Sequence, residues 1–263
     1  MNRERVGIIG LGKLGMWLFD FLKKSGYTPI GSDMKTAMTN EQVIARSDVI
    51  FLATPISTAV TLSRKLAPRL KKDQLVVYMT SVRDRIAKEL LGSKAEVAGM
   101  HVMCRPLRNS EGEAVSLAGE NVVASFDRIE CHREWFEALL ASTEASIAIA
   151  KLYQHDGAAG ITQLIEQQQH LILATLIRQT GIPLSTIKSY ATPLFRKTLE
   201  VIERLLQNDP DLCFDIQHYN GCGRGLREML ITKAVRFNEG IIAGDRESFR
   251  REFVANQKYF GGK

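Results

Sequence analysis

The chain has 263 residues, of which 45% are hydrophobic and 24% charged, a balance typical of a globular protein with a substantial apolar core. Its longest apolar runs, at 6–9 and 49–55, are too short to cross a membrane, and the N-terminus lacks the pattern of a secretory signal. The net charge of +6 comes from scattered basic residues, which disfavours nucleic acid as a partner and suits an anionic small molecule. Four cysteines without metal-type spacing indicate reduced thiols in a cytoplasmic protein, and no metal site is expected.

The first 150 residues alternate between short apolar segments and helix-like segments. Strands are predicted at residues 5–9, 28–31, 48–53, 75–79, 96–99, 121–125 and 145–150, and helices at 13–24, 56–70, 84–91 and 131–140. This alternation is typical of a parallel sheet that helices cover on both faces. We therefore predict an N-terminal α/β domain over residues 1–152, with a Rossmann-type doubly wound sheet.

The remainder of the chain carries only helical periodicity. Helices are predicted at 153–180, 184–190, 193–207, 226–242 and 246–260. The tripeptides Gly181-Ile182-Pro183 and Asn208-Asp209-Pro210 are expected to end helices, and the glycine-rich stretch 220–225 to form a flexible loop. We therefore predict an all-α C-terminal domain over residues 153–263.

A glycine-rich turn joins the first predicted strand to the first predicted helix. It reads Gly10-Leu11-Gly12-Lys13-Leu14-Gly15. The first glycine allows a tight turn, the second lets the backbone approach a pyrophosphate, and the third permits close packing of helix on strand. The helix N-terminus then faces the phosphates. All six residues are candidates for binding a dinucleotide, and a purely structural turn is the alternative.

Residues after the next two predicted strands extend this candidate cofactor site. Asp33 lies 23 residues after Gly10, where a carboxylate accepts hydrogen bonds from the ribose 2′-OH and repels a 2′-phosphate. It favours NAD over NADP, although Lys35 weakens the exclusion of NADP, and a helix-cap role is the alternative for Asp33. Thr54 and Pro55 follow the third strand, at the edge of the sheet where ligands bind.

Four groups of segments carry further residues of recognisable chemistry. They are Thr80-Ser81-Val82-Arg83; Gly99-Met100-His101-Val102-Met103-Cys104-Arg105-Pro106; Gln154-His155-Asp156 with Gln163; and Pro193-Leu194-Phe195-Arg196 with Arg204-Leu205 and Asp209-Pro210. Together they resemble the prephenate/arogenate dehydrogenase family of tyrosine biosynthesis. The resemblance runs from residue 5 to near the C-terminus, and neither a mutase domain nor a regulatory domain is expected.

That resemblance implies an enzyme that oxidises a ring alcohol by hydride transfer to NAD while the ring carboxylate leaves as carbon dioxide. His101 matches the catalytic histidine of the family, which as a neutral imidazole accepts the alcohol proton, and Ser81 matches a serine that hydrogen-bonds near it. Arg204 matches a substrate-binding arginine that can hold a carboxylate bidentately. Gln163 and Arg196 are further candidates for substrate contact. The alternatives are a structural histidine and arginines on solvated helix surfaces.

Two departures from the family pattern concern the substrate side of the site. Where the family has a substrate-contacting histidine twelve positions after His155, this chain has Gln167, which hydrogen-bonds without carrying charge. Gln167 is therefore a candidate substrate-binding residue, while the nearby His170 lies on an adjoining helix face. Beyond the catalytic histidine, Val102 replaces the usual proline and Cys104-Arg105 the usual Phe-Gly. The added arginine either recruits a carboxylate or faces solvent.

The leading hypothesis is an NAD-dependent dehydrogenase of prephenate, arogenate, amino-deoxyprephenate or a related cyclohexadienyl acid. The resemblance also implies a homodimer joined through the C-terminal helices. A second hypothesis is a different Rossmann-plus-helices oxidoreductase, such as an imine reductase or a hydroxyacid dehydrogenase, although the helical half lacks the Gly-x-x-x-Lys pattern of the latter. A third is a non-catalytic dinucleotide-binding sensor, suggested by Gln167.

Overall fold

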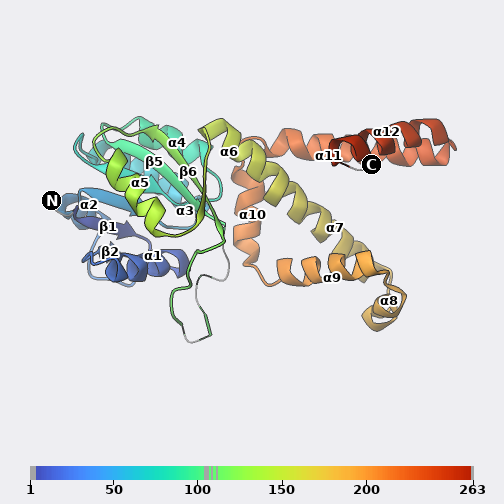
Figure 1. Ribbon diagram of the computed structural model, residues 1–263, viewed down its shortest axis with the longest axis horizontal. Coiled ribbons are helices and arrows are strands. Elements are labelled where there is room, and N and C mark those ends of the chain that lie inside the picture. The colour runs from blue at the N-terminus through green and yellow to red at the C-terminus, as the bar shows by residue number, and fades with distance from the viewer. Residues whose placement is uncertain (1–3, 104–106, 108, 111, 262–263) are drawn as a thin grey trace. The chain divides into compact units, whose positions relative to one another are not determined.

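The computed structural model describes residues 4–103, 107, 109–110 and 112–261 (Figure 1). The chain divides into two compact units, Met1–Gly221 and Cys222–Lys263, and the predicted domain boundary near residue 152 stays a prediction. In the part of the chain that is described, no helix combines the length and apolar character needed to cross a membrane.

One sheet of seven strands forms the centre of the first unit. The strands are β1 (Val6–Ile9), β2 (Ile30–Ser32), β3 (Val49–Leu52), β4 (Leu75–Tyr78), β5 (Glu96–Val102), β6 (Asn121–Arg128) and β7 (Ser146–Ile149). Their order is β2-β1-β3-β4-β5-β6-β7, so β2 lies on one side of β1 and β3 on the other. Open α/β sheets bind ligands at such a switch point. The predicted Rossmann-type doubly wound sheet followed by helices is confirmed.

The predicted parallel direction holds for β1 to β5 and is wrong for β6. β5 and β6 pair antiparallel, with His101 opposite Val123, and β7 then runs parallel to β6. Parallel neighbours need a crossover, usually a helix, and the described residues between β5 and β6 form none. The helix α5 (Arg133–Ser142) does connect β6 to β7.

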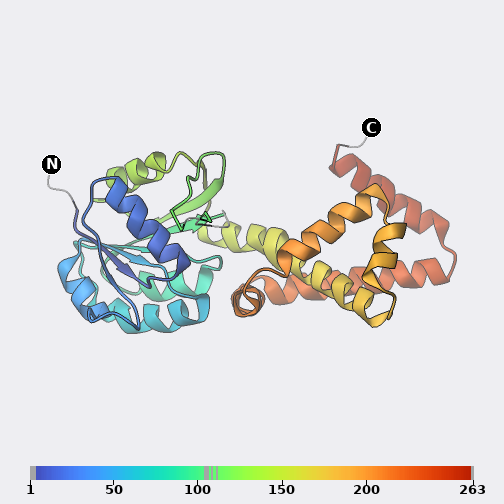
Figure 2. The same cartoon turned by 90° about the horizontal axis from the view of Figure 1, so that it is seen from below.

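Helices cover both faces of this sheet (Figure 2). α1 (Lys13–Lys24) and α5 pack on one face, and α2 (Asn40–Arg46), α3 (Ile56–Leu66) and α4 (Asp84–Leu91) on the other. α1 and α4 have the predicted bounds, whereas the predicted helix 56–70 ends at Leu66 and continues as a 3-10 turn. α2 was not predicted. Its signal in the sequence is the capping box of Thr39 and Gln42.

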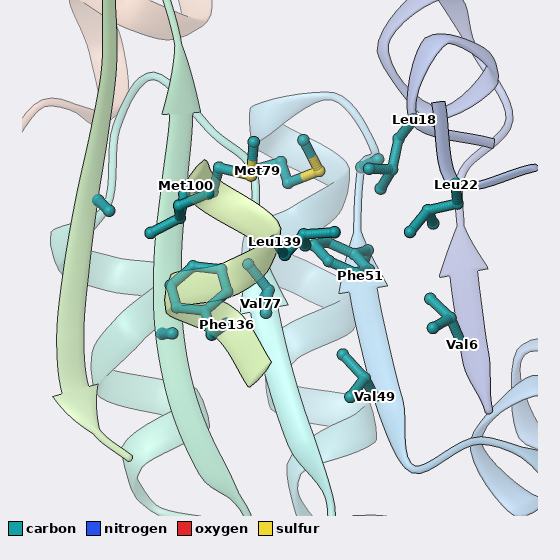
Figure 3. Packing of buried hydrophobic residues seen from close by; sticks show 14 of the residues in the cluster. Val6, Leu18, Leu22, Val49, Phe51, Val77, Met79, Met100, Phe136 and Leu139 are labelled. Carbon is teal, nitrogen blue, oxygen red and sulfur yellow. The ribbon is translucent and has the colours of Figure 1, made fainter. Parts of the chain in front are cut away.

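The apolar core on the α1 and α5 face is closely interdigitated. Figure 3 shows Phe51 and Val77 of β3 and β4 together with Met100 of β5 and Phe136 and Leu139 of α5, and none of these side chains is more than 4% exposed. Burying each such side chain contributes about 1.5–3 kcal/mol to folding. This core holds the strands rigidly and so positions the residues at their ends.

A buried carboxylate–histidine pair anchors the beginning of β5. Glu96 accepts hydrogen bonds from the backbone N–H groups of Glu130, Cys131 and His132 and from Nδ1 of the His132 ring, the last at 2.9 Å. Burial alone would raise the pKa of Glu96, but these hydrogen bonds outweigh it and hold the pKa below its ordinary value. The pair therefore ties β5 to the segment that leads into α5.

Beyond residue 152 the described residues contain no strand, as predicted. The single helix predicted at 153–180 is divided into α6 (Leu152–Ala159), a π-helical turn η2 (Gly160–Ile165) and α7 (Glu166–Gln179). α8 (Leu184–Tyr190) has the predicted bounds, and α9 (Pro193–Leu205) ends two residues early. A π-helical turn widens the helix locally and is frequent at functional sites.

The helix α10 (Pro210–Tyr219) is absent from the predicted elements, because the local pattern of Asn208-Asp209-Pro210 indicates only the end of a helix. Asp209 instead caps the new helix, since its carboxylate accepts the N–H of Asp211 at 2.9 Å, and proline is well tolerated in the first turn. Ile216 of α10 packs against Ile56, Val82 and Leu164. α10 therefore holds the π-helical turn against the sheet domain.

The second unit is a pair of helices, α11 (Gly223–Ile242) and α12 (Arg246–Tyr259). The flexible loop predicted at 220–225 is wrong from Gly223 onward, where α11 has already begun. Adding residues to an existing helix costs little free energy compared with starting one. The helix predicted at 226–242 therefore extends toward the N-terminus through Gly223 and Gly225.

The turn from β1 to α1 depends on its glycines in different ways. Gly10 has a φ of +95°, which other residues rarely adopt, and a Cβ on Gly15 would lie 1.9 Å from the carbonyl oxygen of Gly10. A Cβ on Gly12 would meet no atom within 4 Å. The first and third glycines are thus required by the fold, and the second leaves open space at the start of α1.

Gly15→Ala and Gly12→Ala should therefore separate folding from dinucleotide binding. We expect Gly15→Ala to lower the free energy of unfolding by about 1–3 kcal/mol because of its steric overlap. Gly12→Ala should change that free energy by less than about 1 kcal/mol and should weaken NAD binding at least about tenfold. Thermal unfolding and NAD titration measure the two effects, and unchanged NAD affinity in Gly12→Ala would remove this turn as the phosphate site.

Candidate active site

The N-terminus of α1 presents backbone N–H groups that suit an anion. The first helical hydrogen bond runs from the N–H of Met16 to the carbonyl of Gly12 at 2.9 Å, so the N–H groups of Lys13, Leu14 and Gly15 have no acceptor within the helix. The helix has neither a capping side chain nor an acidic residue in its first turn. The positive end of the helix dipole is thus left for a ligand, as a pyrophosphate requires.

Side chains at the ends of β2 and β3 fit the rest of a dinucleotide. Asp33 is half-buried, and its Oδ2 accepts a hydrogen bond from the N–H of Leu11 at 2.9 Å, which holds the carboxylate beside the turn. Thr54 has a buried hydroxyl with no partner among the described residues, and Pro55 is exposed before α3. A buried hydroxyl without a partner is rare in folded proteins, so this one is suited to a bound ligand.

His101 lies at the same edge of the sheet, on a strand that extends further. β5 pairs Gly99 with Tyr78, the last residue of β4, so His101 is two residues beyond that row. Its side chain is only 5% exposed. Its Nδ1 is 3.0 Å from Nε2 of His155, and its Nε2 is 3.5 Å from the amide nitrogen of Gln163.

His155 and Asp156, on α6, continue these contacts away from the sheet edge. Nδ1 of His155 is 2.9 Å from Oδ1 of Asp156. The Asp156 carboxylate also accepts the backbone N–H groups of Arg83 and Asp84, at 3.1–3.3 Å, where α4 begins. Burial lowers the pKa of His155, and the adjacent carboxylate offsets this only in part. The imidazole of His155 is therefore neutral at physiological pH.

Arg83 places a fully buried cation beside this group. Its Nη2 donates to the carbonyl of Val123 at 2.6 Å, and its guanidinium lies 5.8 Å from the centre of the Tyr78 ring. Nε and Nη1 have no hydrogen-bond partner among the described residues. Burial lowers the pKa of Arg83, but a guanidinium stays protonated. Its charge disfavours a proton on His155 and so contributes to the lowered pKa of that imidazole.

The two predicted glutamines lie on the helical side of the site. Gln163 is in the π-helical turn, and its amide nitrogen also lies 3.5 Å from the sulfur of Met103. Gln167, four residues later in α7, is 8% exposed. The amide oxygens of both glutamines are buried without a hydrogen-bond partner in the described part of the chain.

The other predicted residues are not joined to His101 by any described contact. Ser81 is half-buried after β4, and Arg196 and Arg204 are exposed on α9. Their roles stay predictions. Cys104 and Arg105 lie outside the described residues.

The sequence-based reasoning assigned no role to His155, Asp156 or Arg83. The available signal was the His155-Asp156 pair itself, two polar residues next to the small residues 157–160 near a helix start. Burial of both at 2% exposure depends on contacts with α4, which the local sequence does not reveal.

Comparison with known proteins identifies the family. The nucleotide-binding domain of prephenate dehydrogenase matches residues 30–124, and the dimerization domain of prephenate dehydrogenase matches residues 152–255. A probable arogenate/prephenate dehydrogenase of Methanocaldococcus jannaschii is 22% identical over 97% of this chain. The chain spans only 60% of the length of that relative.

Solved structures show the same fold. Prephenate dehydrogenase of Aquifex aeolicus, in complex with hydroxyphenyl propionate and NAD+, has a TM-score of 0.76 at 17% identity, covering 100% of this chain and 99% of that one. Arogenate dehydrogenase of Synechocystis has a TM-score of 0.70 at 20% identity, covering 98% of each chain.

The match to the nucleotide-binding domain begins at residue 30 and includes Asp33 and Thr54, so the prediction of a nucleotide-binding domain in this part of the chain is confirmed. The two domain matches, which lie in the predicted order and between them cover most of the chain, show that this chain belongs to the prephenate dehydrogenase family.

Proposed function

We propose that this chain catalyses the NAD-dependent oxidative decarboxylation of prephenate or a closely related cyclohexadienyl acid. The setting of His101 supports this proposal most. It is a buried imidazole at the sheet edge that carries the dinucleotide turn, and one of its ring nitrogens is near His155 while the other is near Gln163. A buried neutral imidazole beside a nicotinamide cofactor suits the removal of a proton from an alcohol.

In the proposed reaction, ring C4 loses a hydride and its hydroxyl loses a proton. The C1 carboxylate then leaves as carbon dioxide, and the electrons of its broken bond complete the aromatic ring. NAD+, when bound, accepts the hydride. Nε2 of His101 takes the hydroxyl proton, and the amide N–H of Gln163, next to that nitrogen, donates a hydrogen bond to the C4 oxygen.

The remaining predicted residues take supporting roles in this proposal. The N–H groups at the start of α1 bind the pyrophosphate, Asp33 binds the ribose and Thr54 supplies its hydroxyl to the cofactor. Arg204 and Arg196 bind substrate carboxylates, since both are exposed on α9 and a guanidinium holds a carboxylate bidentately. The net charge of +6 favours an anionic substrate.

His101→Asn should remove most of the activity and spare cofactor binding. We expect kcat to fall by about 100-fold or more, because general-base catalysis typically contributes that much, with NAD affinity nearly unchanged. The assay follows cofactor reduction with prephenate, arogenate and 4-amino-4-deoxyprephenate. His170→Asn is the matched control, because His170 is a half-buried histidine of α7 whose contacts with described residues are to Glu166 of the same helix. Reduction of NAD by none of the three acids, with NAD still bound, would overturn the proposal in favour of a sensor.

Among these acids, the environment of Gln167 favours one that carries an ammonium group on its side chain, as arogenate does. The amide oxygen of Gln167 is buried and has no donor within the described structure, and a buried acceptor left unpaired costs about 1–3 kcal/mol. Gln167 lies about one helical turn, ~5.4 Å, from Gln163, which suits the far end of a six-membered ring whose C4 is at His101. An ammonium N–H can satisfy that oxygen and a keto group cannot.

Gln167→His should therefore shift preference away from arogenate. We expect kcat/KM for arogenate to fall about tenfold, in line with one lost hydrogen bond of about 1.4 kcal/mol, while kcat/KM for prephenate stays equal or rises. Gln169→His, at an exposed position of the same helix, is the control and should change neither value. A wild-type enzyme that prefers prephenate would contradict this reading of Gln167.

We also infer that the chain forms a homodimer through its helical part, as the match to the family's dimerization domain supports. Among the apolar residues of the π-helical turn and α7, Leu164 is buried, but Ile161, Leu171 and Ile172 are 38–56% exposed. Leu176 lies one turn after Ile172 and is 55% exposed. Several exposed apolar side chains along one helix are typical of a surface that a partner covers.

Sedimentation velocity should show a dimer for the wild-type chain. The double substitution Ile172→Glu and Leu176→Glu should produce a monomer, because two carboxylates would have to be buried without partners. Lys65→Glu, at an exposed position of α3, also introduces negative charge and should leave the dimer intact. A wild-type monomer at micromolar concentration would contradict the inference.

A further inference from the structure

Three contacts join Asp156, His155, His101 and Gln163 into one chain. Asp156 Oδ1 and His155 Nδ1 are 2.9 Å apart, His155 Nε2 and His101 Nδ1 are 3.0 Å apart, and His101 Nε2 is 3.5 Å from the amide nitrogen of Gln163. Each contact needs one donor and one acceptor. The position of the proton in one contact therefore limits its position in the next.

The carboxylate of Asp156 sets the direction at one end. It accepts the N–H groups of Arg83 and Asp84 at the N-terminus of α4, so both of its oxygens act as acceptors there. Asn220 holds the same residue in place by donating to its backbone carbonyl at 3.0 Å. An ionised carboxylate only accepts hydrogen bonds, so the hydrogen of this contact is on Nδ1 of His155.

Because His155 is neutral, its Nε2 carries a lone pair. The imidazole is 2% exposed, and burial together with the nearby charge of Arg83 lowers its pKa although Asp156 acts in the opposite direction. Nδ1 of His101 must then be the donor in the 3.0 Å contact. This leaves the lone pair of His101 on Nε2.

The orientation of Gln163 agrees with this assignment. Its amide nitrogen faces two atoms, Nε2 of His101 and the sulfur of Met103, each at 3.5 Å. A thioether sulfur can only accept a hydrogen bond. The amide N–H groups of Gln163 can therefore donate to the sulfur and to a lone pair on Nε2 of His101. A hydrogen on Nε2 would instead place two donors against each other, which is unfavourable.

We propose that Asp156 and His155 are positioning residues that keep the hydrogen of His101 on Nδ1 and so make Nε2 the base. The assignment rests on the proposed function of His101. After Nε2 takes the substrate proton, the resulting imidazolium still donates through Nδ1 to His155, and the Asp156 carboxylate lies beyond it. Without Asp156, His155 can carry its hydrogen on Nε2 and donate it to Nδ1 of His101. The hydrogen of His101 then lies on Nε2, which can no longer act as the base.

A purely structural role for Asp156, as a cap of α4, is the competing explanation, and the chain contains a matched control for it. Glu96 is also a buried carboxylate that accepts backbone N–H groups and binds a histidine, His132, at 2.9 Å. It lies at the opposite end of β5 from His101. Asp156→Asn and Glu96→Gln therefore make the same chemical change, and only the first affects the proposed chain.

The direct test is the tautomer of His101 in the full-length protein labelled with 15N-histidine. Long-range 15N–1H correlation spectra distinguish a hydrogen on Nδ1 from one on Nε2, and the five histidines are assigned by single substitutions. We expect His101 to carry its hydrogen on Nδ1 in the wild type and in Glu96→Gln. In Asp156→Asn, a substantial fraction of His101 should carry it on Nε2.

Kinetics give the second readout. Asp156→Asn should lower kcat by about 100-fold or more, since a wrong tautomer removes the base, with KM for the ring acid changed less than about threefold. His155→Gln should retain more activity than His155→Phe, because a glutamine carbonyl can still accept from Nδ1 of His101. Glu96→Gln should leave kcat within about twofold even where it lowers Tm, since its contacts are remote from the base.

A wild-type His101 with its hydrogen on Nε2, or an unchanged tautomer and kcat in Asp156→Asn, would overturn the proposal. Equal losses of kcat in Asp156→Asn and Glu96→Gln would also overturn it and favour the structural role. A chain with the expected tautomers that reduces NAD with none of the ring acids would contradict the proposed function and leave the proton assignment standing.

Discussion

The site depends on the contact between the carboxylate of Asp156 and the N-terminus of α4. Asp156 belongs to α6, yet its hydrogen bonds reach the backbone of Arg83 and Asp84 in the sheet domain and the ring of His155 beside it. One buried charge thus joins the helical segment to the sheet and orients an imidazole. Burying a carboxylate is unfavourable unless it is fully hydrogen-bonded. The Asp156 carboxylate therefore needs the backbone N–H groups and the His155 ring in place together.

The edge of the sheet supplies the rest of the arrangement. The strands β1 to β4 end together and offer the glycine-rich turn, Asp33 and Thr54, which suit a dinucleotide. β5 continues to Val102 and places His101, two residues beyond the end of β4, where the helical part can contact it. The π-helical turn that carries Gln163 is held there by α10, because Ile216 packs against Leu164. In the proposed function, the cofactor and substrate sides are therefore built from different parts of the chain and meet at His101.

Elements with strong local signals were predicted closely. α1, α4 and α8 have the predicted bounds, because an amphipathic pattern and its flanking stops are contained in the helix itself. The direction of β6 and the helix α10 were not predicted. Strand direction depends on the connection that leads into it, and the proline of α10 has the same local preferences at the start of a helix as after the end of one. In both cases the deciding information lies outside the segment.

The site divides in the same way. The sequence by itself determined the glycine-rich turn and the acidic residue after β2, since each depends on residue type and spacing within a short segment. His101 became the candidate base through the resemblance to a known family. Only the tertiary structure decided which groups lie next to each nitrogen of His101, that His155 and Asp156 continue these contacts, and that Arg83 is buried beside them. Those contacts join residues 54 and 72–73 positions apart. Proton positions follow from such pairings and from burial, and neither is a property of the local sequence.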